Sequence, residues 1–597
     1  MSASSRLASG GPPAERRWVL WFGLLVMILT SIPYVLGYAR QGETWLFTGF
    51  VFGVEDGNSY IAKMISGSYG AWLFKTPYTT SIQRGVIAFL PYLALGKLAF
   101  DGGIHEQLVV LYHIFRIGGG MLAVLATYDF LSIIITNIGL RRIGLVLCIL
   151  GGGLGWLGII LGSKSMPLEF YSPETFGFLS LFGIPHLSLA RATFLWSLVI
   201  YLRFVSSGDP SWWRQSIRLG LLWLATAVAQ PITALVLGIL IGLHCLATGL
   251  WQILRKMPLT LRGARKKYVT PSPANSGVDF VRDLDSSVTT LPRNDVPNKG
   301  ELEKGLRKWL GIVLMVFVSF FIPAPFLLYN YFSFSTDPFL RTWTAQNLIL
   351  SPEPAQYLLA YGLVLPFAIA GIFQLLRRDA WMGMFFTAWM LALPLLAYAP
   401  FNLQRRLLEG AWIGLVALAV AGMEGWREAA LSSSNTWIKA RYSSRWILLL
   451  AFPTTIMLIV GGLLATWRPS MPVFRLNDEI QAFAYLRQSA SPGEVILASF
   501  DTSNALPAWA PLRVVIGHGP ESVALTNLRP QVEAVYSSGW SADKRKQFFN
   551  EYDVRYVIWG PMERKLGEWD PGIASYLKKA FEVGEFQIFE VIPTLPF

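Results

Sequence analysis

Eleven apolar runs, each near the length of a membrane-spanning helix, constrain the fold of this chain more than any other feature. They fall at about 18–39, 107–135, 143–162, 187–203, 216–229, 231–250, 308–332, 356–376, 380–400, 410–425 and 446–466. About twenty apolar residues in a helix cross the hydrocarbon core of a bilayer. Only 15% of the residues are charged, against about 25% in soluble domains. The chain is therefore predicted to be a polytopic α-helical membrane protein with about 11 transmembrane helices, which excludes soluble enzymes and disordered scaffolds.

The formal net charge of +13 is distributed as the positive-inside rule predicts. From residue 468 onward there are 13 basic and 15 acidic residues, so the preceding part carries a net charge of +15. With the N-terminal arm in the cytoplasm, every predicted cytoplasmic loop is basic: Arg141 and Arg142; Arg203, Arg214 and Arg218; the cluster at 255–267; Arg377 and Arg378; and Lys439, Arg441 and Arg445. The charge indicates topology and contact with anionic membrane lipids, not binding to nucleic acid.

This topology predicts a multi-pass protein of the cell (plasma) membrane with a cytoplasmic N-terminus. Residues 1–467 form the predicted transmembrane domain, with the segment 40–106 as a long outer loop. The cytoplasmic loop 251–306 is polar, and we expect it to be flexible. Two stretches leave alternatives open: 85–100 lies along the interface or enters the bilayer, and 216–250 forms two helices or one kinked helix.

Residues 468–597 change in character and are predicted to form a small extracytoplasmic domain. Short β-rich runs at 495–499, 513–517, 554–559 and 586–591 alternate with helix-like segments at 478–487, 541–551 and 571–580. Such alternation predicts an α/β domain with a partly parallel sheet. Gly517–Pro520 and Gly560–Arg564 each follow a strand, where a ligand site and a plain turn are both open and the plain turn is the simpler interpretation.

The most informative polar residues are two adjacent carboxylates, Glu55 and Asp56, in the long outer loop. Asp56 and Tyr60 are four residues apart and would share one face of a helix. Carboxylates there can act as a base toward a hydroxyl or ligate a divalent cation. The alternative is that Asp56 is only an acid at a helix start.

A second polar group, Gln404, Arg405 and Arg406, lies in the outer loop before the tenth run. The charge rule does not require a double arginine outside, and Arg binds phosphate well through bidentate hydrogen bonds. The alternative is a structural pair between Arg405 and Glu409, spaced i,i+4.

His186 and Arg116 are further candidates for substrate binding. His186 lies at the outer entrance of the fourth run, where a packing role is the alternative. Arg116 lies inside the second run, where an arginine is costly and usually faces a cavity or a partner, unless it extends to the surface. Gly153–Gly158 satisfies GxGxxG but lies in an apolar run, so it indicates close helix packing and no dinucleotide cofactor.

Together these features resemble the membrane-embedded glycosyltransferases of the GT-C fold, which use polyprenyl-phosphate sugars as donors. The matching features are a first helix whose N-terminus is cytoplasmic, a long first outer loop with Glu55-Asp56 followed by Tyr60, many membrane spans and an outer α/β domain. The chain looks most similar to bacterial members of this superfamily. It has Glu-Asp where many relatives have Asp-Glu or Asp-x-Asp. The resemblance therefore leaves open which of the two carboxylates has the main catalytic role.

The resemblance implies transfer of a sugar to a glycan, lipid or protein acceptor on the extracytoplasmic side, with inversion. Asp56 or Glu55 would accept the proton of the acceptor hydroxyl or hold Mg²⁺ or Mn²⁺. The implied substrate-binding residues are Tyr60, Arg405, Arg406, Gln404, His186 and Arg116. Two other classes stay open: a transporter or flippase of lipid-linked glycans, and a non-catalytic assembly protein with an outer binding domain.

Overall fold

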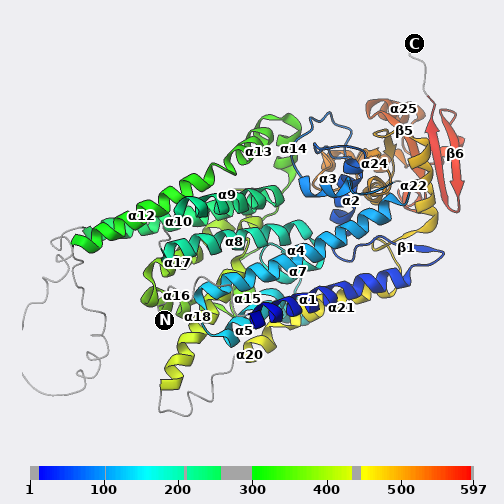
Figure 1. The fold of residues 1–597 in the computed structure, drawn as a ribbon. Helices are drawn as coiled ribbons and strands as arrows, with labels where there is room; N and C mark the ends of the chain where they lie inside the picture. The colour runs from blue at the N-terminus through cyan, green and yellow to red at the C-terminus, as the bar shows by residue number, and fades with distance from the viewer. Residues whose placement is uncertain (1–12, 101, 208–210, 257–298, 433–444, 593–597) are drawn as a thin grey trace, which may run out of the picture.

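Long apolar helices form a bundle, and a small sheet lies beyond one end of it (Figure 1). The computed structural model describes residues 13–100, 102–207, 211–256, 299–432 and 445–592. Most of the segment 251–306, predicted to be flexible, lies outside the described residues. Its two ends belong to the helices α10 and α12.

Seven helices of the described residues are long and apolar enough to cross a membrane. They are α1 (Pro13–Arg40), α4 (Ile104–Ile134), α8 (Pro185–Ser207), α10 (Pro231–Lys256), α17 (Ala380–Ala397), α18 (Ala411–Ser432) and α21 (Pro453–Trp467). The spans of α18 and α21 include the short helices before them, η5 (Gln404–Leu408) and α20 (Arg445–Ala451). The chain is thus an integral membrane protein, as predicted.

Two bent helix pairs raise the number of candidate spans in the described residues to nine. The first pair is α12 (Lys299–Phe320) with α13 (Ala324–Thr336), bent by 58°, and the second is α15 (Pro354–Tyr361) with α16 (Leu365–Arg378), bent by 74°. Pro323 precedes α13, and Pro366 follows the break in the second pair. Proline cannot continue a regular helix, which accounts for the bends.

Two of the eleven predicted runs do not form a spanning helix by length and composition. The run 143–162 is divided between α5 (Ile138–Leu150) and α6 (Gly155–Ile160). Between them the chain passes so close to α15 that a Cβ on Gly153 would lie 2.0 Å from the carbonyl oxygen of Ala360. This supports close packing as the reason for the glycines.

The run 216–229 belongs to α9 (Trp212–Ala229), whose first two turns include Arg214, Gln215 and Arg218. The helices α9 and α10 form a hairpin, because the indole N–H of Trp223 donates to the carbonyl oxygen of Ala234 at 3.0 Å. In one continuous helix these residues would be about 16 Å apart along the axis. The alternative of a single kinked helix over 216–250 is therefore wrong.

The segment between α1 and α4 carries the strand β1 (Trp45–Phe47) and the helices α2 (Val54–Ser68) and α3 (Leu90–Gly96). Gly53 precedes α2 in the left-handed conformation, with φ of +59°, which glycine adopts at little cost. The turn at Gly53 starts α2 so that Glu55 and Asp56 occupy its first turn. Acidic side chains there are stabilised by the helix dipole.

The C-terminal region contains a five-stranded mixed sheet in the order β4-β3-β5-β7-β6. Its strands are β3 (Val495–Leu497), β4 (Arg513–Val514), β5 (Val554–Trp559), β6 (Leu577–Val583) and β7 (Phe586–Val591). The helices are α22 (Asn477–Ser489), α23 (Phe500–Ala505), α24 (Leu525–Val535), α25 (Ala542–Glu551) and α26 (Pro561–Arg564). β3 is parallel to β4 and β5, whereas β7 is antiparallel to β5 and β6.

One predicted helix in this region is wrong. The segment 571–580 forms a short 3₁₀ turn at Pro571–Ile573 and then the edge strand β6. The antiparallel pairing with β7, from Leu577 opposite Val591 to Val583 opposite Phe586, outweighs the local sequence preference.

The C-terminal region packs directly on the first loop. β1 pairs antiparallel with β2 (Phe474–Leu476), so Trp45 lies opposite Leu476. A single buried core contains Ile61 and Met64 of α2 together with Phe474, Phe483 and Trp509. This shared core fixes how the sheet region meets α2.

Candidate functional site

The two adjacent carboxylates at the start of α2 have different partners. The carboxylate of Asp56 accepts a hydrogen bond from Nε2 of His518 at 3.2 Å, and 56% of the Asp56 side chain is exposed. The carboxylate of Glu55 accepts a hydrogen bond from the backbone N–H of Gly519 at 2.6 Å. His518 and Gly519, which are adjacent in the C-terminal region, therefore contact the two acids.

His518 lies in the turn after β4 and is buried, with 4% of its side chain exposed. The hydroxyl of Ser522 accepts hydrogen bonds from the backbone N–H groups of Gly517 and His518, at 2.9 and 3.1 Å. The ring of Tyr78 packs against His518, with centroids 5.4 Å apart. The sequence left a ligand site and a plain turn open here, with the plain turn as the simpler interpretation, and the structure brings this segment to Asp56.

A buried ion pair fastens the same turn to α2. Nζ of Lys63 lies 2.5 Å from Oε1 of Glu521, and both side chains are almost fully buried. The hydroxyls of Ser59 and Thr76 also donate to the Glu521 carboxylate, at 2.7 and 2.5 Å. Burial alone would raise the pKa of Glu521, but the charges of Lys63 and His518 and the hydrogen bonds from Lys63 and Thr76 lower it below its usual value.

Tyr60 lies one helical turn beyond Asp56, on the face that the i,i+4 spacing predicts. Its ring stacks on Tyr92 of α3, with centroids 4.6 Å apart, and lies edge-on to His186, at 5.4 Å. The hydroxyl of Tyr92 and Nδ1 of His186 are hydrogen-bonded at 2.7 Å. Tyr60 and His186, predicted separately, therefore lie together beside Asp56.

The charge of Arg406, which belongs to η5, acts on the same carboxylate. Desolvation would raise the pKa of Asp56, but the hydrogen bond and charge of His518, followed by the charges of Arg406 and Lys63, lower it below its usual value. Nε of Arg406 lies 3.5 Å from a carboxylate oxygen of Glu174 and has no hydrogen-bond partner among the described residues. Asp56 and Arg406 are thus opposite charges at one site, without a direct ion pair.

Arg191, which the sequence reasoning missed, shapes the loop that carries Glu174. Its guanidinium pairs with Glu409 at 2.6 Å and donates to the carbonyl oxygens of Pro173 and Glu174, at 2.7 and 2.8 Å. Like Arg116, Arg191 lies inside an apolar run, 187–203, and this is the sequence feature that could have identified it. The sequence alternative was an ion pair between Arg405 and Glu409. In the structure Glu409 pairs with Arg191 instead.

Three other predicted binding residues have different surroundings. The Arg405 guanidinium lies 4.6 Å over the ring of Tyr171. The Gln404 amide is occupied by the backbone, accepting from the N–H of Ser351 and donating to the carbonyl of Ala399. The guanidinium of Arg116 donates to the hydroxyls of Thr30 and Ser31, at 2.9 and 2.7 Å, and to the carbonyl of Leu181 at 3.3 Å.

Glu55 and Asp56, the carboxylates expected to hold a divalent cation, are not joined by further metal-ligating side chains among the described residues. The two carboxylates face different partners, and the described part of the chain has no group of three or more His, Cys, Asp or Glu side chains that could hold a metal ion. Mg²⁺ is usually held by one or two carboxylates together with waters and substrate phosphates. No step proposed below is assigned to a metal.

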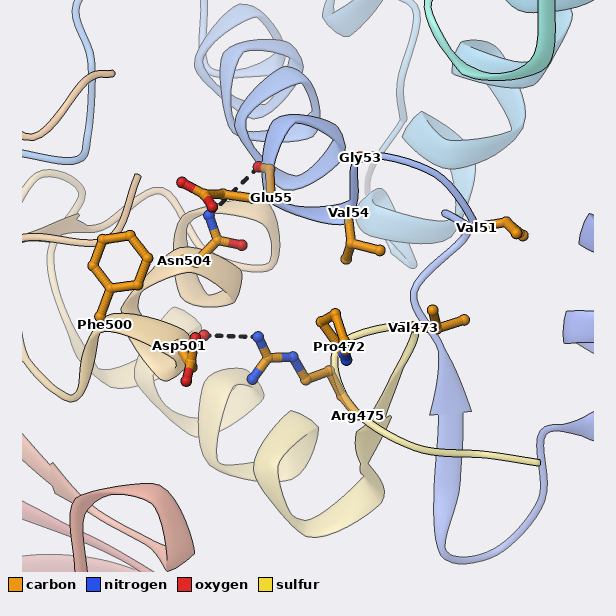
Figure 2. A pocket seen from close by; sticks show the side chains of 10 residues that line it. All are labelled: Val51, Gly53, Val54, Glu55, Pro472, Val473, Arg475, Phe500, Asp501 and Asn504. Carbon is orange, nitrogen blue, oxygen red and sulfur yellow. Dashed lines mark hydrogen bonds between the residues drawn. The ribbon is translucent and has the colours of Figure 1, made fainter. Parts of the chain in front are cut away.

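A cavity of about 400 Å³ opens beside the first turn of α2 (Figure 2). Glu55 lines it from α2, Arg475 from β2, and Asp501 and Asn504 from α23. Asn504 donates to the backbone carbonyl of Glu55, and Arg475 donates to that of Asp501, as the dashed lines in Figure 2 mark. Asp56 is not among the residues that line this cavity.

Comparison with solved structures identifies the fold. The Archaeoglobus fulgidus oligosaccharyltransferase in its apo form aligns over 94% of this chain and 73% of its own, at 13% identity and a TM-score of 0.52. The Archaeoglobus fulgidus oligosaccharyltransferase AglB in complex with an inhibitory peptide and a dolichol-phosphate aligns over 92% of this chain and 70% of its own, at 13% identity and a TM-score of 0.50. ArnT from Cupriavidus metallidurans, bound to undecaprenyl phosphate, covers 95% and 97% at 12% identity and a TM-score of 0.41.

The alignment with the archaeal enzyme confirms the predicted GT-C fold. No protein-family model and no curated protein sequence matches the chain. The similarity is thus one of fold, and the chemistry must be argued from the residues around Asp56.

Proposed function

We propose that the chain is an inverting membrane glycosyltransferase, which moves a sugar from a polyprenyl-phosphate donor to an acceptor hydroxyl on the extracytoplasmic side. The observation that carries the proposal is Asp56, an exposed carboxylate held by His518, with the charge of Arg406 acting on it. The same fold in the archaeal enzyme is known in complex with a dolichol-phosphate, a lipid of the class proposed here.

The proposed chemistry uses the two opposite charges in separate roles. Arg406 binds the phosphate of the donor, since 32% of its side chain is exposed while only its Nε faces the Glu174 carboxylate, at 3.5 Å. The Asp56 carboxylate accepts the proton of the acceptor hydroxyl as its oxygen attacks the anomeric carbon. The bond from that carbon to the phosphate oxygen breaks, polyprenyl phosphate leaves, and the configuration inverts.

Tyr60 and His186 form the wall beside the reacting atoms in this proposal. Burial, followed by the negative charge of Asp56, raises the pKa of Tyr60 well above its usual value. The phenol therefore stays protonated and can donate a hydrogen bond to a phosphate or sugar oxygen. The exposed Asp56 carboxylate leaves room for the acceptor on the other side.

Donor cleavage by the full-length protein in lipid nanodiscs tests the proposal. Synthetic undecaprenyl-phosphate monosaccharides are supplied without an added acceptor, and the release of undecaprenyl phosphate is followed by mass spectrometry. The wild-type protein is expected to release it with water as the acceptor. Movement of intact donor between leaflets with no cleavage of any donor would instead support a flippase.

The variant Arg406→Gln is expected to lower kcat/KM for the donor about 10–100-fold, mostly through KM. A hydrogen bond to a charged group contributes about 1.5–3 kcal/mol, and about 1.4 kcal/mol corresponds to tenfold. Arg405→Gln should have a smaller effect, because that guanidinium lies over Tyr171. Arg377→Gln, exposed at the end of α16, is the matched control and should be neutral. An equal loss in all three variants would contradict the role of Arg406.

The pH dependence of donor cleavage should depend on His518. Asp56 must be ionised to act, and its pKa is lowered in the folded protein. Activity should therefore persist below the usual pKa of an aspartate and fall only as the pH drops through this lowered value. In His518→Ala the acidic limb should move to higher pH, whereas His518→Gln, which keeps an N–H donor, should restore part of the shift. An unchanged acidic limb in His518→Ala would contradict the coupling.

A further inference from the structure

The cavity in Figure 2 combines groups that only accept hydrogen bonds with groups that donate them. Asp501, at the first turn of α23, is exposed, and Glu55 has a second carboxylate oxygen beyond the one bound to Gly519. Ionised carboxylates accept only. On the other wall, the guanidinium of Arg475 can donate only.

Arg475 supplies an independent sign of a missing ligand. Its side chain is 2% exposed, yet its Nε has no hydrogen-bond partner in the described part of the chain. The other guanidinium nitrogens are used, one by Glu479 at 3.1 Å and one by the carbonyl of Asp501 at 2.7 Å. A buried donor left unpaired costs about 1–3 kcal/mol. An acceptor atom in the cavity would offset that cost.

We propose that this cavity binds a neutral carbohydrate through its hydroxyl groups. A hydroxyl donates to the carboxylates of Glu55 and Asp501 and also accepts from Arg475, which neither an ammonium nor a phosphate group can do alone. The apolar surfaces of Val54 and Phe500 fit the C–H faces of a sugar ring. The volume of about 400 Å³ falls within the range of about 300–1,000 Å³ that is usual for small-ligand sites.

The charge of the lining disfavours an anionic ligand. The lining carries two carboxylates, Glu55 and Asp501, against the one guanidinium of Arg475, so it is net negative even without Glu479, whose pKa is raised to about 7 by burial. A peptide backbone offers one amide donor and one carbonyl acceptor per residue. A sugar ring presents hydroxyls on neighbouring carbons, which suits the four polar side chains gathered in this one cavity.

This site deepens the proposed function and rests on it for its role, because Glu55 of the cavity is the neighbour of the proposed base. A carbohydrate bound here would be the acceptor, and it would extend beyond the cavity lining to reach Asp56. The binding itself does not depend on the reaction, so the two proposals can fail separately.

Binding is measured with the full-length protein in lipid nanodiscs, applied to an array of neutral oligosaccharides of two to six units. A lysine-rich peptide and a serine- and threonine-containing peptide are included as competing ligand classes. The variant Asp501→Ala and the variant Val51→Phe, which narrows the cavity, should each weaken oligosaccharide binding at least tenfold. Asp543→Ala, which removes an exposed first-turn acid from α25, is the matched control and should bind as the wild type does.

Failure of this inference and failure of the proposed function give different results. Binding of no oligosaccharide, equal binding by all variants, or binding of a peptide in place of oligosaccharides would overturn the carbohydrate site. Cleavage of undecaprenyl-phosphate sugar with water should continue in Asp501→Ala, because this variant leaves Asp56 and Arg406 in place. If the wild type cleaves no donor but binds an oligosaccharide in the expected variant pattern, the cavity assignment stands and the proposed function is wrong.

Discussion

Replacing Asp56 with asparagine is expected to lower sugar transfer by roughly 10²–10⁴-fold, the usual contribution of a general base. Asparagine has nearly the same size and can still contact His518, but it cannot accept the proton of an attacking hydroxyl. The loss should appear in kcat, both for transfer to an acceptor and for cleavage of the donor by water. The measurement is single-turnover release of undecaprenyl phosphate from the synthetic donor in nanodiscs.

The matched variant is Glu55→Gln, which changes the neighbouring carboxylate in the same helical turn. Because the Glu55 carboxylate is bound to the backbone N–H of Gly519, this variant should have a smaller effect on donor cleavage by water. Binding of undecaprenyl phosphate should be retained in both variants, since Arg406 is unchanged. If Asp56→Asn kept full activity while Glu55→Gln lost it, Glu55 would be the base and the assignment would be reversed.

Replacing Lys63 with methionine is expected to weaken the attachment of the turn 517–522 to α2 by about 3–5 kcal/mol. Methionine fills similar space, but the substitution leaves the Glu521 carboxylate buried without its ion-pair partner. Removing one partner of a buried ion pair has about this cost. Hydrogen exchange of the backbone N–H groups of Gly517 and His518 measures the change, because both are protected by the hydroxyl of Ser522.

A second substitution separates this effect from general damage. In Lys63→Met combined with Glu521→Gln the uncompensated charge is gone, so protection of the turn should largely return. Glu533→Gln breaks the exposed pair with Arg529 on α24 and should change protection by less than about 1 kcal/mol. Unchanged exchange in Lys63→Met would mean that the shared apolar core alone holds the turn.

The helical architecture could be predicted from the sequence because each span is recorded locally, as a run of apolar residues. Where prolines and glycines interrupt a run, its length alone does not say whether one helix, two helices or a bent pair results. The hairpin at Gln230-Pro231 shows this, since its packing depends on the contact between Trp223 and Ala234. Likewise, strand β6 exists through its pairing with β7.

The candidate site could be predicted only in part. Asp56 with Tyr60 follows from helical spacing, and Arg406 stands out because a positive charge is unexpected in a predicted outer loop. The partner of Asp56 was not predictable, because His518 is separated from it by 462 residues and no local pattern records such a contact. The same holds for Lys63 with Glu521 and for Arg191 with Glu409, 458 and 218 residues apart.

The surroundings of Arg116 illustrate a second limit. An arginine inside an apolar run predicts a polar partner, but not whether that partner is a ligand or the protein itself. Here the hydroxyls of Thr30 and Ser31 and the carbonyl of Leu181 occupy its donors. The residue joins α1, α4 and α7 (Gly177–Gly183) inside the bundle.

The central claim is that Asp56 and Arg406 act on one polyprenyl-phosphate sugar. The most direct test is an electron cryo-microscopy structure of the full-length protein in nanodiscs with undecaprenyl phosphate bound. We expect the phosphate within about 3 Å of the Arg406 guanidinium, on the side of α2 that carries Asp56 and Tyr60. A phosphate bound at Arg405 and Tyr171, or elsewhere away from Asp56, would contradict the single-site account.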